Sequence, residues 1–363
     1  MEQEKSEFTT VISKSDTNNS VRTAVNSSEY DQYRETWNEV TNLNKITDFP
    51  TQLDFELNYS CNFTCPMCTW NAESTDGNSN DTWFDFEVFK EVIDDAVPKG
   101  LKSIRMNYIN EPLLNRDIFK FISYARQAGI LDIYFSTNGS LLTDDIIKKI
   151  INSGLLRLQV SLDAHTQETY EKIRTGGNFK DVIKKVLRFL EIRNEVSSKL
   201  PTLRVNFVKT EINKHETDDF IKFWEGKADS IGVQDLVGIM DGYGKKSEEE
   251  LEKIKLSGSF RCAQPFQHLT VRYDGTILPC CTFFGAETPI AQLKTEQETT
   301  FSTITNVGLL DKSLKSKLII RTIQEAWKSK EMEFFREIHK KGEFWRHPVC
   351  KKCVLSTSHF DIE

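Results

Sequence analysis

The chain has 363 residues, of which 38% are hydrophobic and 28% charged, so it can bury a large core and form one large domain with a smaller appendage. The formal net charge is −7 and no lysine- or arginine-rich run stands out, which argues against nucleic acid or an anionic membrane as a partner. No apolar stretch approaches the length of a membrane span and the N-terminus has no signal-peptide core, so we expect a cytoplasmic protein.

The first part of the chain is polar. Residues 1–27 are rich in Ser, Thr, Asn and charge, and residues 29–46 carry aromatic and aliphatic side chains spaced like one face of a short helix. We therefore interpret residues 1–48 as a partly flexible N-terminal extension.

From residue 52 the pattern becomes an alternation of strands and helices, with Leu53, Phe55 and Leu57 in the first strand. Further strands are expected at 102–107, 131–136, 155–161, 202–208 and 232–239. Helices are expected at 86–97, 116–128, 143–152, 179–194 and 216–226. Such repeated units predict an α/β domain over residues 49–240, with a parallel sheet covered by helices. The sequence leaves open whether this sheet curls into a barrel; in either case ligands belong at the carboxyl ends of the strands.

The regular alternation stops near residue 241. The segment 241–250 is rich in glycine and charge and is interpreted as a linker, which opens a third region over residues 241–363. Within that region, Trp327 to His339 has the pattern of a helix.

Eight cysteines are the main chemical feature of the chain. In a reducing compartment, clustered cysteines indicate metal ligands or catalytic groups rather than disulfides. None lies between Cys68 and Cys262, so the chain has two separate cysteine sites, one toward each end.

The first site is the C-x3-C-x2-C run of Cys61, Cys65 and Cys68, directly after the first predicted strand. Three thiolates from one loop, with no fourth ligand nearby in sequence, suit a 4Fe–4S cluster with one open iron. The alternative is a zinc site that borrows a distant fourth ligand.

This segment resembles the signature of the radical S-adenosylmethionine (SAM) enzymes, and the resemblance extends over residues 52–240. It implies a partial (β/α)6 barrel in which the open iron of a 4Fe–4S cluster binds SAM. One electron, from a donor such as flavodoxin or ferredoxin, then yields a 5′-deoxyadenosyl radical that abstracts hydrogen from a substrate.

The resemblance also assigns individual residues. Glu111, in Asn110-Glu111-Pro112, matches the family stretch that holds the amino group of SAM, although Ile109 and Asn110 replace its two glycines. Arg174 matches a family arginine that faces the active site. The other positions assigned to SAM are Met67, Ser136, Asn138, Ser161 and Asp163.

Each assignment has a structural alternative. Glu111 could begin a helix, Thr137-Asn138-Gly139 could be a plain turn, and Arg174 could pair with a surface carboxylate. The shared position of these residues at strand ends favours a site.

The second site combines Cys262 and Cys280 with the C-x2-C pair of Cys350 and Cys353. Asp274-Gly275 predicts a hairpin that brings Cys262 and Cys280 together. On spacing alone, four thiolates suit a zinc ion and a 4Fe–4S cluster equally.

The C-terminal segment resembles the SPASM/twitch extension of radical SAM enzymes, which favours one auxiliary 4Fe–4S cluster. Its cysteine layout resembles that of the 2-deoxy-scyllo-inosamine dehydrogenases. Cys281 is then a spare cysteine: either a small buried residue beside a ligand, or a catalytic donor of hydrogen to a substrate radical, as in radical epimerases.

These resemblances predict an enzyme, an oxidoreductase (dehydrogenase) or epimerase, that abstracts hydrogen from a carbinol carbon of a sugar, aminocyclitol or related small molecule. Radical modification of a ribosomally made peptide is the alternative. A non-enzymatic iron–sulfur or zinc protein is a third possibility, against which the open three-cysteine site argues.

Overall fold

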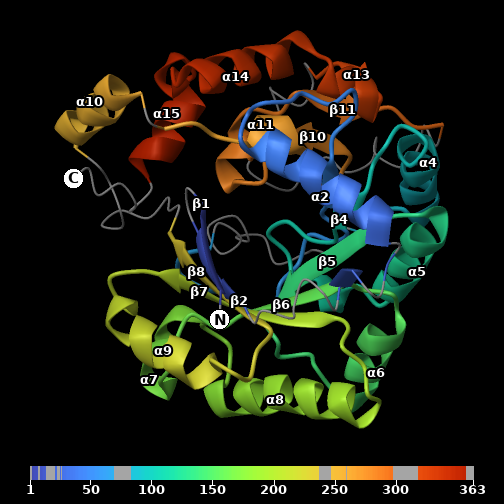
Figure 1. Cartoon of the computed structure of the whole chain (residues 1–363), viewed down its shortest axis with the longest axis vertical. Helices are drawn as coiled ribbons and strands as arrows, with labels where there is room; N and C mark the ends of the chain where they lie inside the picture. Colours follow the sequence, from blue (N-terminus) through green and yellow to red (C-terminus); the bar gives the residue numbers. More distant parts are fainter. Residues whose placement is uncertain are drawn as a thin grey trace.

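The computed structural model describes residues 2–6, 9–13, 21, 22, 25, 27–68, 83–236, 247–258, 260–296 and 318–356. Within them, twelve strands form one sheet in the order β1-β2-β8-β7-β6-β5-β4-β3-β9-β10-β11-β12 (Figure 1). The sheet has β1 at one end and β12 at the other, so it does not close on itself.

Six parallel strands form the centre of this sheet, in the order in which the sequence predicts them. Their bounds are β3 (Gln52–Phe55), β4 (Ser103–Arg105), β5 (Asp132–Thr137), β6 (Arg157–Ser161), β7 (Thr202–Lys209) and β8 (Ser230–Asp235). Because β3 and β8 are not hydrogen-bonded neighbours, the six strands make a partial barrel, as the resemblance implies.

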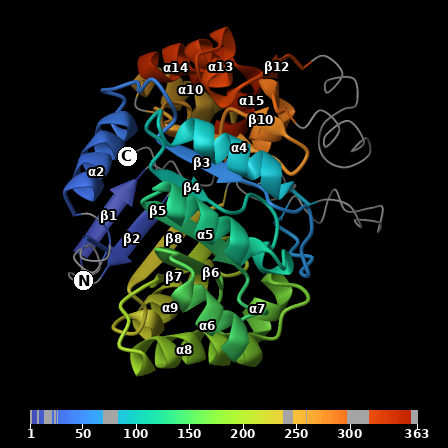
Figure 2. The same ribbon diagram turned by 90° about the vertical axis from the view of Figure 1, so that its right-hand side faces the viewer.

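Helices follow these strands and cover the outer face of the partial barrel (Figure 2). They are α4 (Phe86–Ala96), α5 (Ile118–Ala128), α6 (Asp144–Asn152), α7 (Gln167–Ile173), α8 (Phe179–Glu195) and α9 (Thr217–Trp224). The side chains of Asp85, Thr143 and Asn178 each accept backbone N–H bonds at the start of a helix, which explains where α4, α6 and α8 begin. The alternate residues of the strands that face these helices, such as Leu53 and Phe55, are fully buried in the core.

The C-terminal region extends the same sheet from β3. The hairpin at Asp274-Gly275 is confirmed: β9 (His268–Val271) pairs antiparallel with β10 (Thr276–Leu278), and β9 pairs parallel with β3. The remaining elements are α10 (Glu248–Ser257), α11 (Gln264–Gln267), β11 (Ala291–Leu293), β12 (Ile320–Arg321), α13 (Ile323–Trp327), α14 (Lys330–Lys341) and α15 (Pro348–Leu355), with the short 3-10 helices η1 (Pro112–Leu114), η2 (Lys214–Glu216), η3 (Phe283–Glu287) and η4 (Phe344–Arg346).

The N-terminal extension contains strands that the sequence pattern does not predict. β1 (Glu2–Ser6) and β2 (Thr9–Ser13) form a hairpin whose second strand pairs antiparallel with β8. The expected helix follows as α2 (Ser27–Thr41), and its Tyr33 hydroxyl donates a 3.1 Å hydrogen bond to Asp132 at the start of β5. Helix α2 therefore lies across the amino-terminal ends of the barrel strands, opposite the end where ligands are expected.

Two expectations for the C-terminal region need correction. The segment 241–250 is not a linker throughout, because α10 begins at Glu248 with a capping box between Ser247 and Glu250; residues 237–246 lie outside the described residues. The helix expected from Trp327 to His339 is two helices, because the Ser329 hydroxyl accepts the Met332 N–H and starts α14 anew. None of the described helices is long and apolar enough to cross a lipid bilayer.

Candidate functional site

The first cysteine loop leaves the carboxyl end of β3. Cys65 is buried, while Cys61 and Cys68 are half-buried. The segment after α7 holds this loop in place. Thr64 N–H donates to the Thr175 carbonyl, and the Phe63 ring packs on Gly177, where an added β-carbon would lie 2.8 Å from the ring. The chain thus holds its three predicted cluster ligands at the strand ends, where an α/β fold places its ligands.

The cysteine loop is suited to a metal cluster rather than to free thiols. Burial raises the pKa of the Cys61 thiol to about 12, and Glu111, Cys65 and Cys68 add to this rise. Burial also raises the pKa of Cys65. The Arg174 guanidinium, whose Nη1 lies 4.0 Å from the Cys65 sulfur, acts in the opposite direction and lowers this pKa. Buried thiols of this kind become thiolates only with a cation to neutralise them, which the irons of a cluster provide.

Glu111 lies beside this loop and is fully buried. Its carboxylate accepts hydrogen bonds from Leu113 N–H (3.1 Å), the Thr137 hydroxyl (2.7 Å) and Asn138 N–H (2.8 Å). Burial nevertheless raises its pKa to about 7. Glu111 does cap η1, so the helix-start interpretation describes part of its role, but it also lines the cavity shared with the three cysteines.

Asp163 and Arg174 form a buried ion pair next to Cys65. Asp163 has a positive φ of 59° and also accepts the Val208 N–H at 2.7 Å. Arg174 therefore does not pair with a surface carboxylate; it is held inside by Asp163 and directed at Cys65. Ser136, Asn138 and Ser161 line the same cavity as Glu111, whereas Met67 and Asp163 line the neighbouring cavity described below.

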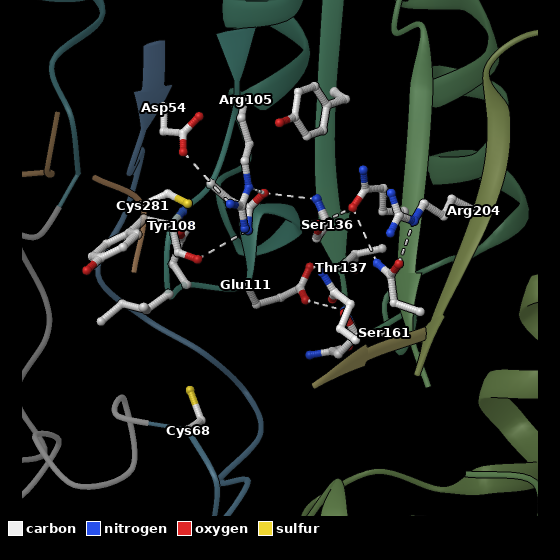
Figure 3. Close-up of a pocket in the computed structure, with 18 of the residues that line it drawn as sticks. Asp54, Cys68, Arg105, Tyr108, Glu111, Ser136, Thr137, Ser161, Arg204 and Cys281 are labelled. Carbon is white, nitrogen blue, oxygen red and sulfur yellow. Dashed lines mark hydrogen bonds and ion pairs between the residues drawn. The ribbon is translucent and has the colours of Figure 1, made fainter. Parts of the chain in front are cut away.

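The interior of the partial barrel is a polar cavity of about 540 Å³ that reaches from α2 to the cysteine loop (Figure 3). Its walls are the alternate, inward-facing residues of the parallel strands, which are polar where their neighbours in sequence are apolar. These residues are Gln52, Asp54, Arg105, Tyr134, Ser136, Arg157, Gln159, Ser161, Arg204 and Asn206.

Four arginines line this cavity: Arg174, which is paired with Asp163, and three on the barrel strands, which differ in their partners. Arg157 makes two hydrogen bonds to Asp132, at 2.9 and 2.7 Å, and Arg105 has its Nη1 3.8 Å from Asp54 Oδ2. Arg204 instead donates from Nε to the amide oxygen of Asn206 at 2.8 Å, and no carboxylate of the described residues lies within ion-pair distance of it. Burial, and secondarily the charge of Arg157, lowers the pKa of Arg204 to about 10, so it remains a cation at neutral pH.

The auxiliary cysteines line a second cavity of about 480 Å³. Burial is the largest cause of the raised pKa of Cys280, Cys350 and Cys353; in addition, Cys280 raises the pKa of Cys350 and of Cys353, and Cys353 raises that of Cys350. Cys262 packs with Cys350 against the same small apolar cluster. A β-carbon at Gly285 would lie 2.8 Å from the Cys280 carbonyl oxygen, so a glycine there leaves the space that this cysteine needs.

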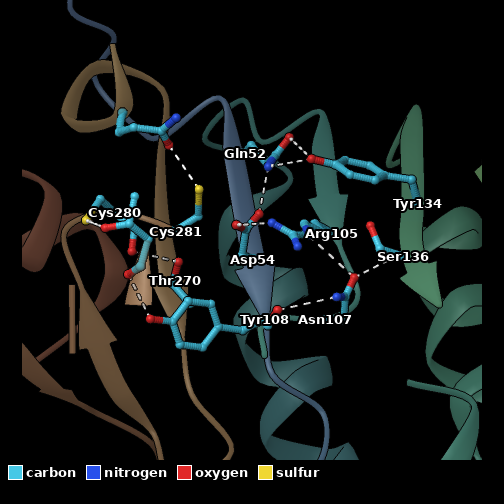
Figure 4. Close-up of polar contacts among 12 residues, drawn as sticks. Gln52, Asp54, Arg105, Asn107, Tyr108, Tyr134, Ser136, Thr270, Cys280 and Cys281 are labelled. Carbon is cyan, nitrogen blue, oxygen red and sulfur yellow. Dashed lines mark hydrogen bonds and ion pairs between the residues drawn. The ribbon is translucent and has the colours of Figure 1, made fainter. Parts of the chain in front are cut away.

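Cys281 lies between the two cavities and lines both. Its thiol donates to the Gln264 side-chain oxygen at 3.2 Å, and it lies beside Asp54 in the view of Figure 4. It is thus not merely a buried neighbour of a ligand, and its role as a hydrogen donor stays a prediction.

Sequence reasoning missed several polar residues that line the barrel cavity, above all Asp54, Arg105, Arg204 and His268. The available signal was the alternation within the strands: Gln52 and Asp54, or Arg157 and Gln159, occupy every second position of otherwise apolar runs. In a barrel, that face is the interior.

Comparison with known proteins gives the family. The Radical SAM superfamily model matches residues 55–223, and the model of an iron–sulfur cluster-binding domain, SPASM, matches residues 262–354. These matches support a SAM-binding 4Fe–4S cluster at the first site and an auxiliary iron–sulfur cluster, rather than zinc, at the second.

Two curated relatives are named "Probable GTP 3',8-cyclase". That of Metallosphaera sedula is 31% identical over 180 residues, which is 50% of this chain and 52% of the relative. That of Methanocaldococcus jannaschii is 30% identical over 171 residues, which is 47% of this chain and 54% of the relative. The chain thus spans about half the length of these relatives.

A solved structure with a TM-score above 0.5 shares the fold, and a second one is similar at a lower score. The crystal structure of anSMEcpe with bound AdoMet and a peptide has a TM-score of 0.52 and 13% identity, and covers 84% of this chain and 87% of its own. The crystal structure of BtrN with AdoMet and 2-DOIA has a TM-score of 0.46 and 14% identity, and the match covers 84% of this chain and 93% of BtrN.

These findings correct the expected reaction. The prediction of carbinol oxidation or epimerisation of a sugar or aminocyclitol, with peptide modification as its alternative, is contradicted by relatives named for cyclisation of GTP. The predictions of a radical SAM enzyme, of SAM and of two iron–sulfur clusters are confirmed, whereas the oxidoreductase or epimerase class is not. The chain belongs to the radical SAM superfamily and carries a C-terminal SPASM iron–sulfur domain.

Proposed function

We propose that this enzyme abstracts a hydrogen atom from a small molecule that carries one anionic group, a carboxylate or a monophosphate, bound by Arg204. The observation that carries the proposal is the half-buried Arg204 guanidinium, which faces the cavity without a carboxylate partner among the described residues. A cation removed from water without a counter-charge is costly, and a substrate anion at this position would offset that cost.

The position of Arg204 suits such a role. It lies near the start of β7, deep in the barrel, whereas the cysteine loop lies at the carboxyl ends of the strands. An anion held at Arg204 would direct the rest of the substrate toward the SAM site, past the polar side chains of Ser136, Gln159 and Asn206. Gly232 supports this arrangement, because a β-carbon there would lie 2.2 Å from Arg204 Nη2.

The charge of the cavity sets a limit on the substrate. Arg157 and Arg105 are already neutralised by Asp132 and Asp54, so the described walls offer one uncompensated cation. A nucleoside triphosphate, with about four negative charges, generally requires several cations or a metal ion. The cavity therefore favours a substrate with a single anionic group over the GTP of the relatives.

When bound, SAM and the first cluster would supply the radical chemistry with one electron from an external donor. Cys61, Cys65 and Cys68 would hold the cluster, and the Glu111 carboxylate would accept a hydrogen bond from the amino group of SAM. The other residues that would bind SAM are Met67, Ser136, Asn138, Ser161 and Asp163. Arg174, held by Asp163, keeps a positive charge beside Cys65.

The test uses the reduced holoenzyme with SAM and an extract of deuterated metabolites from cells grown in D2O. Substrate hydrogen abstraction transfers deuterium to 5′-deoxyadenosine, which mass spectrometry detects. We expect the compound that supports this transfer to bind an anion exchanger, and Arg204→Gln to lower its kcat/KM by about 100-fold or more, as loss of a charged contact does.

Gly232→Ala, which keeps the charge but displaces the guanidinium, should also lower kcat/KM, whereas the exposed Arg188→Gln should not. The proposal fails if the active compound passes through the exchanger unretained or if Arg204→Gln has no effect. Conversion of GTP to a cyclised product would instead give this chain the activity of its curated relatives.

A further inference from the structure

A second set of polar groups in the barrel has no assigned contact with SAM or with the substrate in the reaction described above. Asp54, His268 and Cys281 bring one carboxylate oxygen, one ring nitrogen and one sulfur within 4.8 Å of one another. We propose that these three residues bind a single divalent cation of the zinc type, separate from both iron–sulfur clusters.

The sheet topology explains how these residues meet. β9 runs parallel to β3, with His268 opposite Gln52 and Thr270 opposite Asp54, so Asp54 and His268 lie on the same inward face one step apart. Cys281 follows β10, the next strand of the hairpin, and Thr270 Oγ1 donates to the preceding carbonyl of Cys280 at 3.3 Å. In Figure 4, Cys281 lies next to Asp54 beyond the end of this hairpin.

The strongest evidence for a ligand is the state of His268. Its side chain is 4% exposed, and neither ring nitrogen has a hydrogen-bond partner among the described residues. Buried polar atoms are nearly always satisfied, and an unsatisfied one is unfavourable. Asp54 is fully buried, and its Oδ2 also lacks a hydrogen bond, with Arg105 Nη1 3.8 Å away. A cation among these atoms would satisfy both residues.

The donor set fits a cation of borderline softness. Zinc binds carboxylate oxygen, imidazole nitrogen and thiolate sulfur at about 2.0 to 2.3 Å. The two anionic ligands, a carboxylate and a thiolate, would offset its charge, with the Asp54 carboxylate shared between the metal and Arg105, whose Nη1 lies 3.8 Å from Oδ2. Burial lowers the pKa of His268, so the ring is neutral at pH 7, which is the form that coordinates a metal.

The site is open on one side. All three residues line the barrel cavity, so three protein ligands leave the fourth tetrahedral position for water or a substrate oxygen. Binding would also exclude one predicted role of Cys281, because a metal-bound thiolate has no S–H bond to give to a substrate radical.

The experiment uses the holoenzyme reconstituted anaerobically with iron and sulfide, so that the cluster cysteines are occupied. One equivalent of Zn²⁺ is added, loosely held metal is removed by gel filtration with a weak chelator, and iron and zinc are counted by mass spectrometry. We expect about eight iron and about one zinc per chain. X-ray absorption at the zinc edge should show a single sulfur neighbour at about 2.3 Å.

Three variants make the result specific. His268→Gln and Asp54→Asn should lose zinc and keep iron, and Cys281→Ser should lose the sulfur neighbour. Gln264→Ala removes the hydrogen-bond partner of Cys281 without removing a ligand, so it should keep both metals. Retention of iron in each variant shows that the protein has folded.

The proposal is overturned if the holoenzyme retains no zinc, or if His268→Gln retains as much as the wild type. It is also overturned if zinc has several sulfur neighbours, because the ion then occupies a vacant cluster site. None of these outcomes depends on the substrate proposed for Arg204.

Discussion

Burial decides the ionisation of individual side chains at this site more than their hydrogen bonds do. Glu111 accepts three hydrogen bonds that favour its ionised form, yet desolvation raises its pKa to about 7. The same competition raises the pKa of the buried cysteines and lowers that of Arg204. At the residue scale, the site is built from groups whose charged forms are costly to bury unless a ligand or a counter-charge offsets that cost.

Glu111 should therefore make the stability of the protein pH-dependent. Its pKa is higher in the folded state than the usual value near 4.5, so folding favours its protonated form. The resulting stabilisation is present below pH 4.5 and is lost as the pH rises through 7, a change of about 3 kcal/mol. Urea unfolding without SAM, at pH 5 and pH 7.5, should show Glu111→Gln gaining stability relative to wild type as the pH rises. An unchanged difference between the two proteins would contradict the shift.

At the element scale, the β9–β10 hairpin carries one auxiliary cysteine and positions its neighbours. Cys280 follows β10 directly, and η3 returns so closely that Gly285 contacts it. α15, which carries Cys350 and Cys353, packs against the same region, with Lys352 bonded to Glu287. A short hairpin, a 3-10 turn and a helix thus bring together cysteines that lie far apart in sequence.

Gly285→Ala should disrupt the auxiliary cluster selectively. The added β-carbon would lie 2.8 Å from the Cys280 carbonyl oxygen and 3.0 Å from its sulfur, so the cysteine must move. We expect iron to fall from about eight to about four per chain, while SAM still binds at the first cluster. Gly258→Ala is the control, because nothing lies within 4 Å of its added β-carbon and its positive φ costs only about 1 kcal/mol. Full iron content in Gly285→Ala would refute this prediction.

At the scale of the whole molecule, the two matched domains share one sheet and one core. β9 of the C-terminal region pairs with β3 of the barrel, and Arg272 forms a buried ion pair with Glu56 across this junction at 2.9 Å. Both side chains are almost completely buried, with the Tyr59 and Tyr273 rings near the guanidinium. The auxiliary domain is therefore part of the barrel wall rather than a detachable module.

Breaking this ion pair from one side should destabilise the whole chain. Arg272→Met leaves Glu56 charged in the interior, which costs about 3 to 5 kcal/mol. The double variant Arg272→Met with Glu56→Leu removes both charges and should recover most of that loss. Thermal unfolding of the anaerobic protein measures both variants. If the single variant is as stable as wild type, or the double variant is no better than the single one, the pair does not join the domains as described.

The sequence by itself determined the order of the six barrel strands and their helices, the two cysteine sites and the family. Those features are local: alternating and helical periodicity, caps and cysteine spacing are set by residues close together in the chain. Only the tertiary structure decided which side chains share the barrel interior. The placement of Arg204 in the barrel, away from every described carboxylate, and the meeting of Asp54, His268 and Cys281 depend on the curl of the sheet and on β9 joining β3, which no local pattern specifies.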